Sequence, residues 1–351
     1  MTTRKDIADR LGVSVSVVSR ALNNSGYVQP DKKDAILNLA RELGYTREPA
    51  ALRDGGQSSR RLLLYTENTR NPFYIEFFIG MDDAAQKLGY TVMRCRLPGP
   101  GEGSVADAAG LVFSSEAVAD AYLNGVGRND FTPAVCAAFG DVRQLPRHVT
   151  IIECDLWRGT EVLIDYLRQR GHRRIAAISP FPLSNTDARL QCWRSCMLPE
   201  FGARMDEYFL SITDDTRAAN GSLLAGGSGI AHLSAEDYFE NGVLGARHFV
   251  ESGCDATAAI CFNEEMALGF IKALSALGRR VPEDISVIGY DGTYLRRYFD
   301  KPLTVLDMQP YRQGQRCVEA LADLIRGRKV RNQRVVPTTI LEGATVRDLN
   351  R

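Results

Sequence analysis

The spacing of apolar side chains predicts three short helices at the start of the chain. Residues 4–11 place their apolar side chains on one helical face, and Gly12 is typical of a residue that ends a helix. A second helix is predicted over 14–23, with a serine as its N-cap, and a third over 30–43. Three amphipathic helices with a tight turn between the first two indicate a helix-turn-helix module over residues 1–45.

The rest of the chain alternates between strand and helix patterns, after a Gly/Ser-containing stretch at 46–60 that is typical of a linker. The predicted strands are 62–66, 91–97, 110–113, 134–138, 150–154, 175–179, 258–262, 286–290 and 303–306. The predicted helices are 74–88, 157–170, 189–197, 235–252, 264–277 and 311–326. This alternation indicates parallel sheets covered by helices on both faces. We therefore expect an all-α head joined to an α/β body of two doubly wound parallel-sheet subdomains.

The composition is that of an ordinary globular protein, with 44% hydrophobic and 25% charged residues. No apolar run is long enough for a membrane span, and the N-terminus lacks the apolar segment of a secretory signal. We expect a cytoplasmic protein with no membrane partner. The eight cysteines form no C-x-x-C pair and are expected to be reduced thiols, and no metal site is predicted.

Charge is distributed unevenly, although the net charge of the chain is zero. Residues 1–60 carry ten Lys or Arg against seven Asp or Glu, whereas the remainder carries 33 against 36. A basic head on a slightly acidic body indicates a polyanionic partner for the head.

The second predicted helix separates into an apolar face and a polar face. At about 100° per residue, Val18 faces the core, whereas Ser16 and Arg20 project together from the opposite side. Arg pairs with guanine through two hydrogen bonds, Ser donates or accepts, and Val15 can contact a thymine methyl. A solvated helix face is the simpler alternative, but the basic head favours contact with DNA. The predicted DNA-contacting residues of the head are Ser14, Val15, Ser16, Ser19, Arg20 and Asn23.

Motifs in both parts of the chain point to one family of proteins. They lie at 5–8, 11–23 and 43–45 in the head, and at 71–74, 89–90, 170–176, 262–267 and 281–291 in the body. The last reads VPEDISVIGYD, close to the pattern V-P-x-D-x-S-V-x-G-F-D. Together they resemble the LacI/GalR family of bacterial transcription repressors over almost the whole chain. The resemblance implies a homodimer that binds double-stranded operator DNA and is controlled by a small effector.

The resemblance also implies how the head meets DNA. By position, Val15, Ser16 and Arg20 are the base readers, and the linker is a hinge helix that wedges a leucine into the minor groove. The usual wedge position is Asp54 in this chain, and a carboxylate repels phosphates. Either Leu52 is the wedge in a shifted register, or intercalation is weak.

The implied body is periplasmic-binding-protein-like, with two subdomains that clamp the effector. The implied effector-binding residues are Phe73, Asp155, Arg189, Asn263, Tyr290 and Asp291. Carboxylate, amide and guanidinium groups bind sugar hydroxyls, and an aromatic ring covers the apolar face of a pyranose. We expect a sugar or sugar derivative, with a nucleobase or nucleoside co-repressor as the alternative. A turn-capping Asp291 and a core Phe73 are the simpler structural interpretations of those two residues.

The expected domain boundaries follow from these assignments. The head covers 1–45, the linker 46–60 and the body 61–351. Within the body we expect an N-subdomain of 61–156 plus 291–306 and a C-subdomain of 157–290 plus 307–345. The stretch 98–109 is too short for the long helix that the family has there, and 213–234 is expected to be a surface loop.

Two other classes of protein are disfavoured. The glycines at 99, 101 and 103 give G-x-G-x-G rather than the G-x-G-x-x-G of a dinucleotide site, and no nucleophile elbow, zinc-protease or phosphate-loop motif is present. We therefore predict no catalytic residues, no cofactor and no enzyme activity. A sugar-binding receptor module would share the body fold, but residues 1–45 argue against it.

Overall fold

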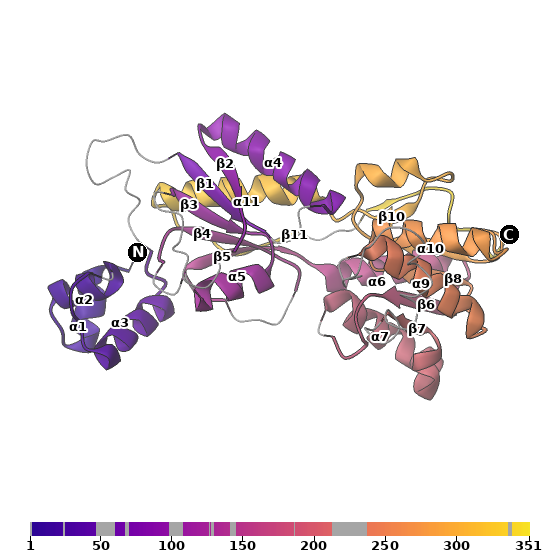
Figure 1. The fold of residues 1–351 in the computed structure, drawn as a ribbon, viewed down its shortest axis with the longest axis horizontal. Coiled ribbons are helices and arrows are strands. Elements are labelled where there is room, and N and C mark those ends of the chain that lie inside the picture. The colour runs from indigo at the N-terminus through magenta and orange to yellow at the C-terminus, as the bar shows by residue number, and fades with distance from the viewer. Residues whose placement is uncertain are drawn as a thin grey trace, which may run out of the picture. The chain divides into compact units, whose positions relative to one another are not determined.

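Two compact units make up the chain (Figure 1). The computed structural model describes residues 2–23, 25–46, 60–66, 70–97, 108–125, 127, 130–140, 145–185, 187–212, 237–335 and 339–351. The first unit consists of 1–69, 76–153 and 311–335, and the second of 70–75, 154–310 and 336–351.

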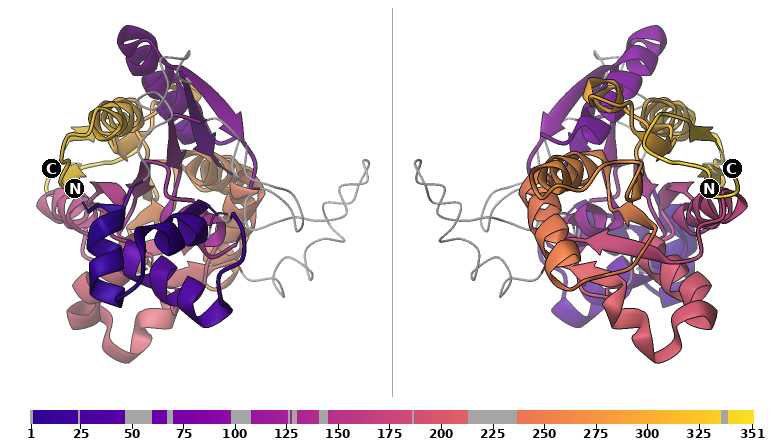
Figure 2. Two further views of the ribbon diagram at one scale, coloured as in Figure 1. Left: turned by 90° about the vertical axis from the view of Figure 1, so that its left-hand side faces the viewer. Right: turned by 90° about the vertical axis from the view of Figure 1, so that its right-hand side faces the viewer.

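The head is a three-helix module built from α1 (Arg4–Leu11), α2 (Val15–Asn23) and α3 (Pro30–Glu42), drawn in indigo in Figures 1 and 2. Thr3 caps α1, because its side chain accepts a hydrogen bond from the Asp6 amide. Gly12 ends that helix with a φ of 63°, a left-handed conformation that glycine adopts without steric cost. The three helices confirm the prediction for 1–45.

The core of the head recruits a side chain from far along the sequence. Ile7, Val18 and Ile36 are fully buried together, as the helical spacing predicts. Phe131 belongs to the same cluster and is fully buried, with its ring edge-on to Tyr45 at a centroid distance of 5.6 Å. The helices of the head therefore bury apolar surface against Phe131, which lies in the segment before β4, as well as against one another.

The first sheet has six strands in the order β11-β5-β4-β3-β1-β2. They are β1 (Arg61–Tyr65), β2 (Thr91–Cys95), β3 (Gly110–Phe113), β4 (Ala134–Ala138), β5 (Val149–Cys154) and β11 (Gln333–Val335). The pairs from β2 through β1, β3 and β4 to β5 are all parallel.

Alternate residues of these strands face two separate cores. Leu62 and Leu64 pack against α4 (Pro72–Leu88) and α11 (Pro310–Ile325), whereas Leu63 and Tyr65 pack against α5 (Glu116–Asn124). Figure 1 shows α4 and α5 on opposite sides of the sheet. Because both faces are covered, the inner strands β3 and β4 are apolar and buried throughout, as in other doubly wound sheets.

The second sheet has the order β12-β10-β9-β8-β6-β7. Its strands are β6 (Ile175–Ser179), β7 (Phe209–Ser211), β8 (Ala258–Cys261), β9 (Ser286–Gly289), β10 (Thr304–Leu306) and β12 (Ile340–Leu341). β12 pairs with β10 antiparallel, whereas β10-β9, β9-β8, β8-β6 and β6-β7 are parallel. The helices are α6 (Leu156–Gln169), α7 (Ala188–Phe201), α9 (Tyr238–Glu251) and α10 (Glu264–Ala276), with 3-10 turns η3 (Gly202–Glu207) and η4 (Tyr294–Tyr298).

Two expected assignments to subdomains are wrong. β10 lies in the second sheet, although 291–306 was expected in the N-subdomain. Conversely, α11 buries Cys317, Val318 and Leu321 against the first sheet, although 307–345 was expected in the C-subdomain. The apolar stripe of α11 is equally compatible with either sheet, so the sequence pattern does not distinguish them. The expected features at 98–107 and 213–234 lie outside the described residues.

Several general expectations can be compared with the described part of the chain. No helix there is long and apolar enough to cross a bilayer, and no group of three or more metal-ligating side chains gathers among those residues. All eight cysteines are free thiols.

Helices α9 and α10 approach so closely that glycine is required where they cross. A β-carbon on Gly242 would lie 2.1 Å from the Met266 carbonyl oxygen, and one on Gly269 would lie 1.9 Å from the Phe239 carbonyl oxygen. Since these neighbours are backbone atoms, neither can turn aside.

We expect Gly269→Ala to destabilise the second unit by about 3 kcal/mol, because the added methyl forces the two helices apart. Both tryptophans lie in this unit, so denaturation followed by tryptophan fluorescence measures the change. Ser275→Ala, at an exposed position of the same helix, is the control and should change stability by less than about 0.5 kcal/mol. Equal stabilities for the two variants would contradict the packing described.

Candidate DNA-contacting helix and effector-binding surface

Helix α2 presents a polar face because its other face is sealed in the head core. Val18, Ala21 and Leu22 are at most 1% exposed, whereas Ser16 and Arg20 are exposed on the opposite side. The Arg20 side chain makes no ion pair with any residue that the structure describes. The side chains of Ser16 and Arg20, each two residues from Val18 along the helix, are thus accessible to the edge of a DNA groove.

The other predicted DNA-contacting residues of the head are partly engaged within it. The Ser14 hydroxyl accepts a hydrogen bond from the Val17 amide at 3.3 Å. The Ser19 hydroxyl accepts hydrogen bonds from the Arg4 guanidinium at 3.2 Å and the Asn23 side-chain amide at 3.3 Å. Ser19 is half-buried, so its main structural role is to hold α1 against α2.

Val15, at the first turn of α2, is 45% exposed, as its position predicts. Arg4 was not predicted, but it also donates to the Tyr45 hydroxyl at 3.1 Å and so ties α1 to the end of the head. Leu52 and Asp54 lie outside the described residues, so the question of the wedge stays a prediction.

Two predicted effector residues begin helices in the second unit. Asp155 caps α6 and accepts a hydrogen bond from the Arg158 amide at 3.0 Å. Asn263 caps α10, and its side-chain oxygen accepts from the Met266 amide at 2.9 Å. Asn263 follows the carboxyl end of β8, the edge at which ligands bind in sheets of this type.

Arg189 is held rigidly at the start of α7. Its guanidinium makes two hydrogen bonds to the Asp187 carboxylate, at 3.0 and 2.8 Å, and a third to the Phe262 carbonyl oxygen at 3.0 Å. Its central carbon lies 3.5 Å from the centre of the Phe262 ring, a cation–π contact. The side chain is only 12% exposed, so its charge is compensated mainly by Asp187.

The remaining predicted effector residues are buried. Phe73 is 4%, Tyr290 2% and Asp291 5% exposed. The Tyr290 hydroxyl lies 2.9 Å from the Thr160 hydroxyl, and burial raises the pKa of Tyr290. Neither Phe73 nor Tyr290 therefore offers an open ring face in this structure, and their role in effector binding stays a prediction.

Asp291 has a structural role that the sequence left open. Its backbone φ is 98°, in the region that favours glycine, and its carboxylate accepts a hydrogen bond from the Glu264 amide at 3.3 Å. The Glu264 carboxylate in turn accepts from the Thr293 amide at 3.0 Å and from the Thr293 hydroxyl. This network fixes the start of α10 beside the end of β9.

An aromatic cluster that the sequence analysis missed lies beside Arg189. The Phe181 and Phe262 rings meet edge to face with centroids 5.2 Å apart, and Tyr238 stacks on Phe262 at 6.0 Å. Phe181 and Tyr238 are half-buried, so part of each ring is accessible. Phe181 and Phe262 closely follow β6 and β8, which are neighbours in the sheet. This adjacency of the two strands was the sequence signal that could have placed the two rings together.

A carboxyl group with an altered pKa lies three residues after Phe262, in the first turn of α10. Burial, together with the negative charges of Asp291 and Asp237, raises the pKa of Glu265 to about 7. Glu265 can therefore be both a hydrogen-bond donor and an acceptor near neutral pH. We use the name effector surface for Phe181, Arg189, Tyr238, Phe262 and Glu265.

The head and the body each match a known family of sequences. Residues 3–48 match the bacterial regulatory proteins of the lacI family, and residues 164–346 match a periplasmic binding protein-like domain. The chain belongs to the LacI family of bacterial regulatory proteins. It is accordingly a DNA-binding transcriptional regulator, and the predicted class of fold is confirmed.

Relatives agree with this assignment along the full length. The HTH-type transcriptional repressor PurR of Vibrio cholerae serotype O1 (strain M66-2) is 27% identical over 364 residues, which cover 100% of both chains. Among solved structures, the regulator CelR in complex with cellobiose has a TM-score of 0.62 at 21% identity and covers 98% of this chain and 100% of its own. The lac repressor dimer bound to operator and the anti-inducer ONPF has a TM-score of 0.58 at 23% identity, with 99% of each chain covered.

We expect Asp187→Ala to lower the stability of the second unit by about 3 kcal/mol, because it leaves the guanidinium of Arg189 buried without its counter-ion. Tryptophan fluorescence during denaturation measures this change. The matched control is Asp284→Ala, which breaks the pair with Arg280, whose side chain is 71% exposed, and should change stability far less because solvent screens that pair. If Asp187→Ala changed stability as little as the control, Arg189 would not need Asp187 to compensate its charge.

Proposed function

We propose that this protein is a repressor that reads operator DNA with the polar face of α2. Binding of a small effector raises or lowers its affinity for the operator. The observation that carries the proposal is the exposure of Ser16 and Arg20 on a helix whose opposite face is fully buried. The Arg20 guanidinium suits a guanine edge, and the Ser16 hydroxyl suits either a base or a phosphate. Such a protein acts with the chromosome in the cytoplasm.

We further propose that the protein binds as a homodimer. A single α2 helix reads only a few base pairs, whereas two copies related by a two-fold axis read two half-sites of a pseudo-palindromic operator. The similar lac repressor structure is a dimer on operator, which supports this arrangement for the present chain.

For the effector we propose a sugar or sugar derivative bound at the effector surface. The half-buried rings of Phe181 and Tyr238 can cover the apolar face of a pyranose. Arg189 and Glu265 supply directional partners for hydroxyl groups, since one donates only and the other does both near neutral pH. The similar CelR structure holds cellobiose, in line with this class of ligand.

A nucleobase or nucleoside is the alternative effector. The same stacked rings suit a flat purine or pyrimidine, and the relative from Vibrio cholerae is named PurR. In either case the effector shifts operator affinity by the difference between its affinities for the two states of the protein. A sugar that weakens DNA binding is an inducer, whereas a base that strengthens it is a co-repressor.

Replacing the base-reading arginine tests the role of α2. We expect Arg20→Ala to cost about 1–3 kcal/mol of operator affinity and to relax base preference, while binding to scrambled DNA changes little. Fluorescence anisotropy with both DNAs measures the two affinities, and Arg279→Ala, an exposed arginine of the second unit, is the control. If the unmutated protein bound cognate and scrambled DNA equally, base readout by this helix would be refuted.

A thermal-shift screen tests the class of effector. We expect a sugar such as cellobiose or ribose to raise the melting temperature of the unmutated protein, because a ligand that binds only the folded state stabilises it. Phe181→Ala should weaken that ligand at least about 10-fold through loss of stacking, whereas Leu277→Ala, which removes an exposed side chain elsewhere on the second unit, should not. Stabilisation by purine bases but by no sugar would replace the sugar by the alternative.

A further inference from the structure

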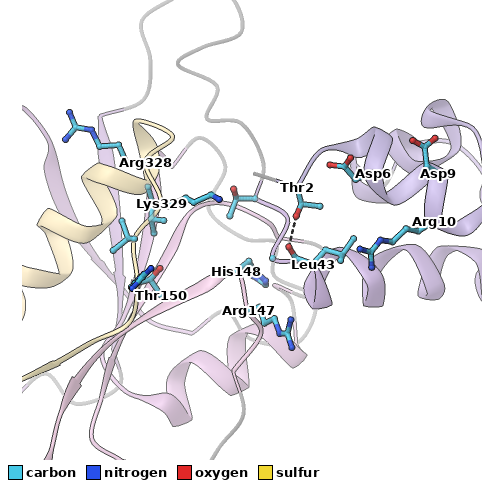
Figure 3. Close-up of a pocket in the computed structure, with 15 residues that line it drawn as sticks. Thr2, Asp6, Asp9, Arg10, Leu43, Arg147, His148, Thr150, Arg328 and Lys329 are labelled. Carbon is cyan, nitrogen blue, oxygen red and sulfur yellow. Dashed lines mark hydrogen bonds between the residues drawn. The ribbon is translucent and has the colours of Figure 1, made fainter.

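A polar cavity lies where the head meets the sheet of the first unit (Figure 3). Its volume is about 840 Å³, within the range of small-molecule sites. The head contributes residues of α1 and of the segment that follows α3. The rest of the lining comes from the residues just before and at the start of β5, from the last turn of α11 and from the segment that follows α11. Figure 3 shows His148 between Thr150 of β5 and Leu43 of the head.

The lining of this cavity is rich in positive charge. Arg147, Lys329 and Arg331 are exposed on the body side and make no ion pair with any residue in the described ranges. Arg10 adds a fourth cation from the head, whereas Arg328 is already paired with Asp323 at 2.9 Å. These four cations come from both sides of one cavity, and none of them is in an ion pair with a described residue. They repel one another unless an anion lies between them.

The carboxylates of the lining do not neutralise these cations. Asp6 is occupied within the head, where it accepts hydrogen bonds from the Thr3 amide at 2.7 Å and the Thr3 hydroxyl at 2.8 Å. Asp9 is exposed on α1. Among the described residues of the lining, two carboxylates against these four cations leave an excess of positive charge.

His148 provides a second and independent reason to expect a ligand. It lines the cavity, is only 4% exposed, and neither of its ring nitrogens has a hydrogen-bond partner among the described residues. Its ring packs against Phe131 of the head cluster, with ring centroids 5.5 Å apart. A buried imidazole without partners is costly, and an acceptor placed in the cavity removes part of that cost.

The imidazole is a neutral donor at physiological pH. Burial, assisted by the positive charge of Arg41 and opposed by Asp130, lowers the pKa of His148 to about 4. One ring nitrogen therefore carries a hydrogen and can donate it to an anion without adding a charge of its own.

We propose that this cavity binds a phosphate group, held by Arg147, Lys329 and Arg331 together with the ring N–H of His148. A phosphate has three or four oxygens that can accept from several donors at once, and guanidinium groups match it in pairs. A cation would be repelled, and an apolar ligand would leave the arginines and the imidazole unsatisfied. The cavity exceeds the size of one phosphate, which fits a phosphate ester or a phosphate of the operator backbone.

Such a ligand would link the head to the body of the first unit. Arg10 approaches from α1, whereas Arg147 and Arg331 come from segments that flank the sheet. An anion that contacts both sides binds only when the head lies against Phe131, and so it stabilises that arrangement by mass action.

The test is calorimetric titration of the full-length protein with pyrophosphate, without DNA and at constant ionic strength. We expect measurable binding to the unmutated protein and at least a 10-fold weaker affinity in the Arg147→Ala, Arg331→Ala double variant. Arg147→Lys with Arg331→Lys should retain most of the affinity because the charges remain. The control is Lys272→Ala with Arg279→Ala, two exposed cations of the second unit, which should change nothing.

His148→Phe separates the imidazole from the cations. The phenyl ring preserves the packing against Phe131 but has no N–H, so we expect weaker pyrophosphate binding with an unchanged melting temperature. Melting curves of every variant confirm that each is folded. No heat with the unmutated protein up to about 10 mM pyrophosphate, or equal affinities in the unmutated protein and the alanine double variant, would overturn the proposal.

The source of the phosphate is decided by the salt dependence of DNA binding. If the operator backbone fills the cavity, the alanine double variant should lower the slope of log affinity against log salt by about 1 for each phosphate that is no longer neutralised, and pyrophosphate should compete with DNA. If a free phosphate ester fills it, the slope stays the same and pyrophosphate still binds in the presence of DNA. Arg20→Ala leaves pyrophosphate binding intact, so a failure of operator reading is distinguishable from a failure of this site.

Discussion

The burial of one face of α2 is the constraint on which the function of the head depends. Val18, Ala21 and Leu22 are sealed among side chains of α1 and α3, and this fixes the rotation of α2 about its own axis. With that rotation fixed, the polar side chains of the opposite face can only point outward. DNA recognition by this face of α2, as proposed above, therefore depends on an apolar contact inside the head.

A comparable constraint organises the second unit. Parallel strands end at the same edge of their sheet, so residues distant in sequence, such as Phe181 and Phe262, become neighbours there. Rigid partners then hold the polar groups: Asp187 and the Phe262 ring immobilise Arg189, and the network around Glu264 fixes the first turn of α10. A surface prepared in this way loses little conformational entropy when a ligand binds.

Periodicity in the sequence was sufficient for most helices and strands and for the exposed face of α2, because these depend on local spacing. It did not predict α5 or the short strands β7, β11 and β12. It was insufficient for α11, whose apolar stripe does not record which sheet it covers. The burial of two implied effector-binding residues was also not evident from the sequence. Tyr290 and Phe73 were placed by resemblance to a family position, whereas their burial is decided by neighbours such as Thr160 that spacing along the chain does not reveal. The hydrogen bond from Arg4 to Ser19 and the contact of Tyr45 with Phe131 likewise join positions with no periodic relation.

The presence of Phe131 in the core of the head bears on where the recognition module ends. A fragment cut after residue 45 would keep all three helices but would expose the side of Tyr45 that Phe131 covers. The packed core of the head is thus discontinuous in sequence, and an excised head would lack one of its buried rings. Substitutions at positions 45 and 131 should accordingly be treated as one site in any dissection of this regulator.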